Sequence, residues 1–454
     1  MTTDAAPARP LRRILGLGFG LAVAFGGTVG VGILRLPGTL AAALGDARLV
    51  VLFWILGGVY ALLGAVAVAE LSAMMPQAGG FYVYARRAFG NGAGFVVGWS
   101  DWLNNVASVA YASITATTFL GVLWPDATVH PRAVAVVIVA LFTAFHWIGL
   151  RMSRGITGVI SVAVGVMLLG LVAACFIAPA STLAATPPLA GTAVSLPLFS
   201  SAMLGAVVIA LRSVLVTFDG WYSPIYFAEE NTDPARTLPR AIVGGTVLIA
   251  ALYLVINIAF LRVLPISVMA ASQLPAADAA RVVLPQGGAV LVTVISLATV
   301  LSLVNAALML PPRILLAIGR DGLFTSWATR VSAGGTPRVA LALTSATTVI
   351  LILTGTFDQI VSLAAVLFLL NYLSAYAAMF VLRRREPDAP RPYRAIGYPA
   401  TTAIVLLGSI LFEIAAFADD WRYGVVAGLL VVGFVLLYLA IRRTLPSRSV
   451  GRPL

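Results

Sequence analysis

The sequence contains few charged residues and no lysine. Only 10% of its 454 residues are charged, whereas 60% are hydrophobic. A soluble domain carries about 25% charged residues, so this composition excludes an ordinary soluble protein and predicts an integral membrane protein. All 29 basic residues are arginines, and the formal net charge is +12.

Cysteine and histidine are almost absent. Cys175 is the single cysteine, and His130 and His146 are the only histidines. These counts exclude an intramolecular disulfide and leave too few ligands for a metal centre built from cysteine or histidine. We therefore predict no metal and no cofactor.

Long apolar stretches recur along the whole chain. A helix needs about 20 apolar residues to cross a bilayer, and twelve stretches have roughly that length. They lie at 14–43, 48–75, 94–122, 132–150, 155–178, 203–229, 238–263, 286–318, 337–354, 359–382, 398–418 and 423–441. The prediction is an all-α membrane protein with twelve transmembrane helices, flanked by tails at 1–13 and 442–454.

The arginines gather in alternating loops and in both tails. Loops rich in positive charge face the cytoplasm, so both tails are expected on the cytoplasmic side of the cell (inner) membrane. An even number of helices agrees with this topology. The basic charge is thus interpreted as a topology signal, and no nucleic-acid binding is predicted.

Two of the predicted spans contain helix-breaking residues. GGTVGVG (26–32) interrupts the first span, and TFDGWYSP (217–224) interrupts the sixth. Interrupted spans at corresponding positions of two halves indicate the binding site of a transporter. The five-helix offset predicts inverted repeats at 14–178 and 203–382, which form a core (14–382) followed by helices 11 and 12 (398–441).

The breaks suggest a specific binding chemistry. Unpaired backbone groups in hydrocarbon cost several kcal/mol each, so a span is unwound only where protein or a wet cavity shelters it. Free N–H groups at a half-helix N-terminus suit a carboxylate, and free carbonyls suit an ammonium group or a metal cation. We expect an amino acid to bind between the two sets, which are the N–H groups of Thr28, Val29, Gly30, Val31 and Gly32 and the carbonyls of Val216, Thr217 and Phe218. Alternatively, Gly26 and Gly30 only allow close helix packing.

Ionisable residues inside a membrane are functional candidates, because burying them is costly. Asp219 lies in the second break, where it would contact substrate, carry a coupling proton, or cap freed N–H groups. Arg35 and Arg212 would line an outer vestibule or extend toward the membrane surface. Glu70, near the cytoplasmic end of the second span, is expected to pair with loop arginines or to handle protons.

Four motifs together resemble the amino acid–polyamine–organocation (APC) superfamily, and within it the bacterial relatives of the L-type amino acid transporter light chains. They are GTVGVGI (27–33), AELSAMMPQAGGFYVYARRAFG (69–90), FDGWYSPIYFAEE (218–230) and RILLAIGRDGLF (313–324). The resemblance implies a LeuT-type 5+5 inverted-repeat fold and alternating-access transport. It assigns substrate binding to Thr28, Gly30, Gly32, Ile33, Phe218, Asp219 and Gly220, with Phe218 as a gating aromatic.

One departure from the family concerns coupling. Many relatives have a lysine in helix 5, but residues 154–174 contain none. The transporter could therefore be coupled to a proton at Asp219 or to sodium. The sodium ligands would be the hydroxyls of Ser296, Thr299 and Ser302. Alternatively, these hydroxyls only form hydrogen bonds to the backbone of their own helix. The outer loop at 123–131 lacks cysteine, so no disulfide-linked heavy chain is expected.

These observations favour a secondary transporter of neutral L-amino acids, lying among membrane lipids. A cationic amino acid or polyamine transporter of the same superfamily is the alternative. A channel fits the two opposed breaks poorly, and no cluster of catalytic groups at one depth supports an intramembrane enzyme. The segment 76–95 is predicted to form either a short interfacial helix or an ordinary loop.

Overall fold

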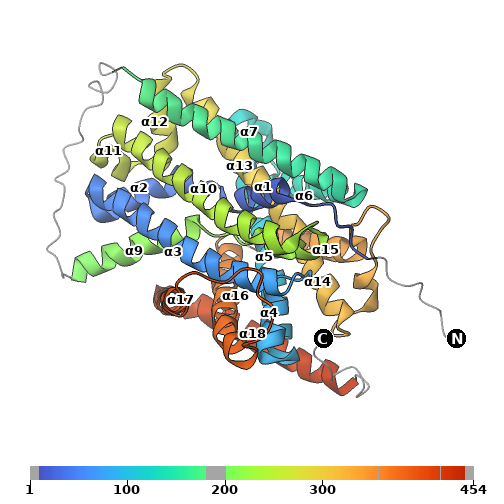
Figure 1. The fold of residues 1–454 in the computed structure, drawn as a ribbon. Coiled ribbons are helices and arrows are strands. Elements are labelled where there is room, and N and C mark those ends of the chain that lie inside the picture. The colour runs from blue at the N-terminus through green and yellow to red at the C-terminus, as the bar shows by residue number, and fades with distance from the viewer. Residues whose placement is uncertain (1–9, 180–200, 356, 420, 445–454) are drawn as a thin grey trace.

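The computed structural model describes residues 10–179, 201–355, 357–419 and 421–444, and its regular elements there are helices (Figure 1). The first half contains α1 (Leu17–Thr28), α2 (Gly32–Leu44), α3 (Ala47–Met74), α4 (Phe81–Phe89), α5 (Asn91–Leu123), η1 (Pro125–Thr128), α6 (Pro131–Ile148) and α7 (Leu150–Ile177). The second half contains α9 (Ser201–Thr217), η2 (Ser223–Glu230), α10 (Pro234–Val263), α11 (Ile266–Ala271), α12 (Pro275–Val283), α13 (Gly288–Met309), α14 (Pro311–Arg320), η3 (Ser326–Thr329), α15 (Arg338–Thr354), α16 (Phe357–Arg385), α17 (Ala400–Asp419) and α18 (Trp421–Thr444).

Helices occupy all twelve predicted ranges, but they differ in their capacity to span a bilayer. Among the described residues, seven helices are long and apolar enough to cross, or eight when α1 and α2 count as one bent span. Shorter apolar helices lie at Met203–Thr217, Arg338–Thr354 and Ala400–Ile414. The structure is thus an all-helical membrane protein, while the number of twelve spans stays a prediction. The predicted tails lie mostly outside the described residues.

Local sequence explains where several helices begin. The Asp46 carboxylate accepts hydrogen bonds from the backbone N–H groups of Arg48 and Leu49, which caps α3. Proline occupies the first turn of α6, α10 and α14, where its missing N–H leaves no acceptor unpaired. At Pro311 this proline also separates α13 from α14 within the predicted eighth span.

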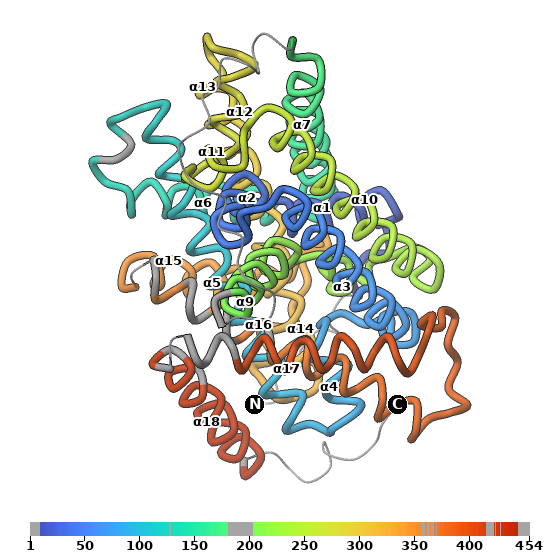
Figure 2. Tube along the Cα trace, turned by 90° about the vertical axis from the view of Figure 1, so that its left-hand side faces the viewer, coloured from blue at the N-terminus to red at the C-terminus, as the bar shows by residue number. Residues whose placement is uncertain are grey.

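Helix α5 lies at the centre of the packing and contacts α4, α6, α13, α15 and α16. The long helices α3 and α10 pack against each other, and α1 packs against α7 and α10. Figures 1 and 2 both place α17 and α18 at one edge of the molecule. Of the broken segments, η2 is buried almost throughout, whereas α9 exposes several apolar side chains, among them Leu204, Val208 and Ile209.

The segment 76–95 forms a helix, α4, rather than an ordinary loop. Its residues Phe81 to Ala85 are buried, and it packs against α5 and α16. Arg87 at its end is exposed and forms an ion pair with Glu386. Most of the helix is thus buried against other helices, and its position at the membrane interface stays a prediction.

Candidate substrate site

The first predicted break is present between α1 and α2, whose axes differ in direction by 47°. The N–H of Val29 bonds the carbonyl of Phe25 at 2.7 Å and closes α1. Helix α2 then begins at Gly32, so the N–H groups of Gly32 and Ile33 have no intrahelical acceptor. This start of α2 leaves N–H groups beside the break. The prediction that the N–H of Val29 is free is wrong, because that group closes α1.

The second predicted break follows α9, which ends at Thr217, and precedes η2, which begins at Ser223. Gly220 lies between them with a φ of +107°, a conformation that L side chains rarely adopt. A Cβ atom built on Gly220 would overlap the carbonyl of Gly27 and would lie 3.0 Å from the N–H nitrogen of Thr28. The two breaks therefore touch through their backbones, and α2 packs on α9 while α1 packs on η2.

Tyr253 of α10 joins the two broken helices. Its hydroxyl oxygen lies 2.9 Å from the Thr28 carbonyl oxygen and 3.2 Å from the Thr217 carbonyl oxygen. The single hydroxyl proton is thus shared between the last residues of α1 and α9. Sequence reasoning missed Tyr253, because its neighbours along the chain form an uninterrupted apolar helix.

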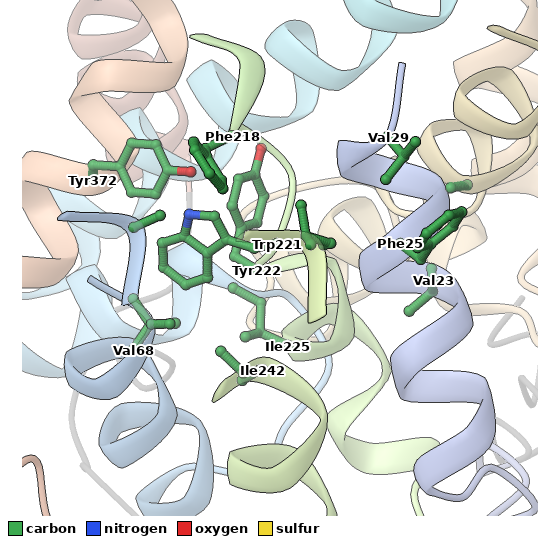
Figure 3. Close-up of a cluster of buried hydrophobic side chains, with 14 of the residues drawn as sticks. Val23, Phe25, Val29, Val68, Phe218, Trp221, Tyr222, Ile225, Ile242 and Tyr372 are labelled. Carbon is green, nitrogen blue, oxygen red and sulfur yellow. The ribbon is translucent and has the colours of Figure 1, made fainter. Parts of the chain in front are cut away.

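A cavity of about 280 Å³ lies where the two breaks meet. Seven of the ten predicted substrate-site residues line it: Thr28, Gly30, Gly32, Val216, Thr217, Asp219 and Gly220. The other three, Val29, Ile33 and Phe218, are not among its lining residues, and their side chains are buried. Figure 3 shows Phe218 and Trp221 grouped with Tyr372, away from Val29 on α1.

The glycines of the first break have different surroundings. A Cβ on Gly26 would lie 2.9 Å from the Ser302 hydroxyl oxygen and 3.4 Å from that of Ser161, so Gly26 permits close helix packing. A Cβ on Gly30 would meet only a Leu303 methyl carbon at 4.0 Å. The packing explanation therefore fits Gly26, whereas Gly30 borders open cavity.

The carbonyls of Val216 and Thr217, which the sequence assigned to an ammonium group, each already accept a hydrogen bond. The Val216 carbonyl accepts the N–H of Asp219 at 3.3 Å, and the Thr217 carbonyl accepts from Tyr253. Each carbonyl oxygen has two lone pairs, so one acceptor position remains on each. The Thr28 hydroxyl donates to the Ala24 carbonyl at 2.9 Å and is thereby tied to its own helix.

Polar side chains of α5 complete the cavity, and α16 supplies a hydrogen-bond partner for Asp219. Asn104, Ser108, Tyr111 and Thr115 line it from one face of α5. Asp219 accepts a hydrogen bond of 2.8 Å from the Tyr372 hydroxyl of α16. The α5 residues were missed from the sequence, although their offsets of four, three and four residues place them on one helix face.

A protein-family model described as amino acid permease matches residues 20–441, which include both breaks and the helices around the cavity. This chain belongs to the amino acid permease family. The permease is similar to the serine/threonine exchanger SteT of Bacillus subtilis, with 26% identity over 88% of this chain and 90% of that protein. It is 24% identical to the b(0,+)-type amino acid transporter 1 of Mus musculus, over 95% and 88% of the two chains. It is 25% identical to the large neutral amino acids transporter small subunit 2 of Rattus norvegicus, over 95% and 81%.

The residues predicted to hold sodium lie on α13 of the permease and are not among the cavity-lining residues. Ser296, Thr299 and Ser302 are all buried. The Thr299 hydroxyl donates to the Ser296 carbonyl at 2.8 Å, which is the backbone bond considered as the alternative. The Ser302 hydroxyl faces Gly26 of α1.

Acidic residues of the permease form ion pairs at one end of the bundle. Glu70 pairs with Arg383 at 2.7 Å and with Arg391 at 3.1 Å, which confirms the expected pairing with arginines. Glu230, at the end of η2, is fully buried and pairs with Arg313 of α14 at 2.9 Å. These contacts hold η2 against α14.

Two further sequence candidates lie at the surface. Arg35 and Arg212 are both exposed and are not among the cavity-lining residues. Cys175 is a free cysteine buried in α7.

Proposed function

We propose that the permease is a secondary transporter that moves neutral L-amino acids across the membrane by alternating access. The proposal includes a LeuT-type architecture of twelve spans, with inverted repeats at 14–178 and 203–382 and both tails in the cytoplasm. Its family membership supports amino acid transport, and the two breaks five helices apart support the repeat.

One observation carries the proposal: the start of α2 and the end of α9 border the same cavity. The N–H groups of Gly30 and Gly32 would bind the α-carboxylate, and the carbonyls of Val216 and Thr217 would bind the α-ammonium. Both charges of a zwitterion are then met by backbone dipoles. Such a site does not require a charged side chain.

The chemistry of the cavity wall favours a small polar substrate side chain. Asn104, Ser108, Tyr111 and Thr115 offer amide and hydroxyl groups along α5. A site that hydrogen-bonds a substrate hydroxyl discriminates strongly against analogues without one. The serine/threonine exchange named for the bacterial relative agrees with this preference.

A cationic amino acid or polyamine substrate is the second candidate, and Asp219 is the observation that favours it. Its carboxylate borders the cavity and accepts one hydrogen bond from Tyr372. A polyamine, however, has no carboxylate to bind at the start of α2. Coupling through a sodium ion near Ser302 or through a proton also belongs to the proposal.

Reconstitution into liposomes tests the function. Uptake of a panel of labelled neutral and cationic amino acids and polyamines is measured with and without sodium, a pH gradient and internal amino acid. Saturable uptake of neutral amino acids is expected. Uptake of polyamines alone, or conductance without saturation, would contradict the proposal.

The variant Gly30→Leu tests the site itself. The only neighbour of a Cβ at this position is Leu303 at 4.0 Å, so the larger side chain extends into the cavity without a backbone clash. We expect a folded, monodisperse protein that has lost uptake. Normal uptake by this variant would place the substrate elsewhere.

A further inference from the structure

Asp101 is a fully buried carboxylate on α5 that the substrate site does not use. Its oxygens accept hydrogen bonds from three side chains. The Tyr226 hydroxyl lies 2.8 Å from Oδ1 and 2.9 Å from Oδ2, and the amide nitrogens of Asn105 and Asn371 lie 3.0 Å and 3.2 Å from Oδ1. Each of these partners is a neutral donor.

No basic side chain among the described residues forms an ion pair with Asp101. The titratable groups that interact with its carboxylate are Tyr226, Tyr222 and Asp219. Five arginines on helices packed against α5 have ion-pair partners elsewhere: Arg86 with Asp321, Arg87 with Glu386, Arg313 with Glu230, Arg320 with Glu229 and Arg383 with Glu70. An unpaired buried charge is costly, and within a membrane protein it indicates a functional group.

The hydrogen bonds of Asp101 join three elements. Tyr226 belongs to η2, which follows the second break, while Asn371 belongs to α16 and Asn105 to α5. The Tyr226 ring packs directly on Gly80, which has a φ of +59° and no room for a Cβ, so the hydroxyl has a fixed direction. Asn105 also lines the substrate cavity. Asp101 therefore lies between the cavity and the segment that follows the broken helix.

A proton added to Asp101 would change this network. The neutral acid needs an acceptor. The amide nitrogens of Asn105 and Asn371 can only donate, and the Tyr226 hydroxyl donates its own proton to the carboxylate. Oδ1 of Asn371 is buried and accepts no hydrogen bond from any described residue. If the Asn371 amide turns over, this oxygen accepts the new proton, and one bond that held the charged form is lost.

We propose that Asp101 is a proton-binding site of the permease, which holds η2 against α5 and α16 when ionised and loosens this contact when a proton binds. The proton enters from the cavity beside Asn105 and converts the carboxylate to the neutral acid. Substrate movement is thereby coupled to a proton gradient. The inference rests on the proposed transport function and extends it to the coupling ion.

The test uses the full-length protein in liposomes that contain a pH-sensitive dye. Proton entry is recorded after addition of the panel amino acid that the wild-type protein takes up fastest, alongside counterflow of the same amino acid. Wild-type protein is expected to admit protons with substrate. Asp101→Asn, which keeps the shape of the side chain, is expected to lose proton entry while retaining counterflow.

Glu413→Gln is the matched control, because Glu413 is another carboxyl on an apolar helix, α17, and its variant should retain proton entry. If Asp101→Asn does not fold, Asn371→Ala tests the same network; it keeps the carboxyl but removes the acceptor, and it should lower proton entry relative to uptake. Undiminished proton entry in the folded Asp101 variant, or in Asn371→Ala, would overturn the inference. Wild-type uptake without proton entry would overturn it and leave the transport function standing, whereas absence of any uptake would contradict that function.

Discussion

Replacing Tyr253 with phenylalanine removes the hydroxyl that joins the two broken helices. The carbonyls of Thr28 and Thr217, at 2.9 Å and 3.2 Å, share its single proton. The substitution removes the one hydroxyl proton, so one buried carbonyl is left without a donor. An unsatisfied buried acceptor costs about 1–3 kcal/mol, and we expect the free energy of unfolding to fall by about 2 kcal/mol. A lower melting temperature in detergent checks this expectation.

The variant Tyr253→Phe should also lose substrate affinity, in addition to its loss of stability. The Thr217 carbonyl belongs to the proposed ammonium site, and its direction is set by this hydrogen bond. A loss of about 1.4 kcal/mol in substrate binding corresponds to about a tenfold weaker affinity. The Michaelis constant for uptake should rise by at least that factor.

Tyr60→Phe provides the matched control. The Tyr60 hydroxyl donates to the Val405 carbonyl at 2.9 Å, between α3 and α17, and Tyr60 is not among the residues that line the substrate cavity. Its removal should lower the melting temperature comparably and leave uptake intact. The reasoning is refuted if Tyr253→Phe transports like the wild-type protein, or if both variants lose uptake equally.

Two further variants test the breaks and the ion pairs around them. Gly220→Ala should prevent folding, because the φ of +107° at this position strains an L residue by about 1–3 kcal/mol and the new Cβ would overlap the Gly27 carbonyl. A variant that elutes as a monodisperse peak in size-exclusion chromatography and remains active would contradict this expectation. Glu230→Gln leaves the buried Arg313 without its partner, which costs about 3–5 kcal/mol; its melting temperature should fall markedly, and the second change Arg313→Met should restore much of the loss.

The sequence was sufficient to locate both helix breaks, because helix-breaking residues act on their own segments. Glycines at 26–32 and the Asp219, Gly220 and Pro224 cluster sit inside otherwise continuous apolar runs, and the structure ends helices at both places. The pairing of Glu70 with arginines was expected from its place near the cytoplasmic end of its span, although its partners Arg383 and Arg391 are distant in the sequence. The breaks themselves depend only on residues close together in the sequence.

Features that depend on long-range packing escaped the sequence analysis. Tyr253 lies in an apolar helix and gains its role only because α10 passes beside both breaks. Asp101 was detectable as a carboxyl within a predicted span, but its partners Tyr226 and Asn371 come from distant segments. Phe218 was assigned to the cavity by resemblance, yet its side chain is buried outside the lining.

Competition by substrate analogues tests the central claim most directly, namely that bare backbone groups of the two breaks bind both ends of an amino acid. Uptake of labelled L-serine into liposomes is measured against unlabelled L-serine, its decarboxylated amine and the hydroxy acid that lacks the amino group. The account predicts that L-serine competes and that neither analogue does. Competition by the amine or by the hydroxy acid with an affinity equal to that of L-serine would contradict it.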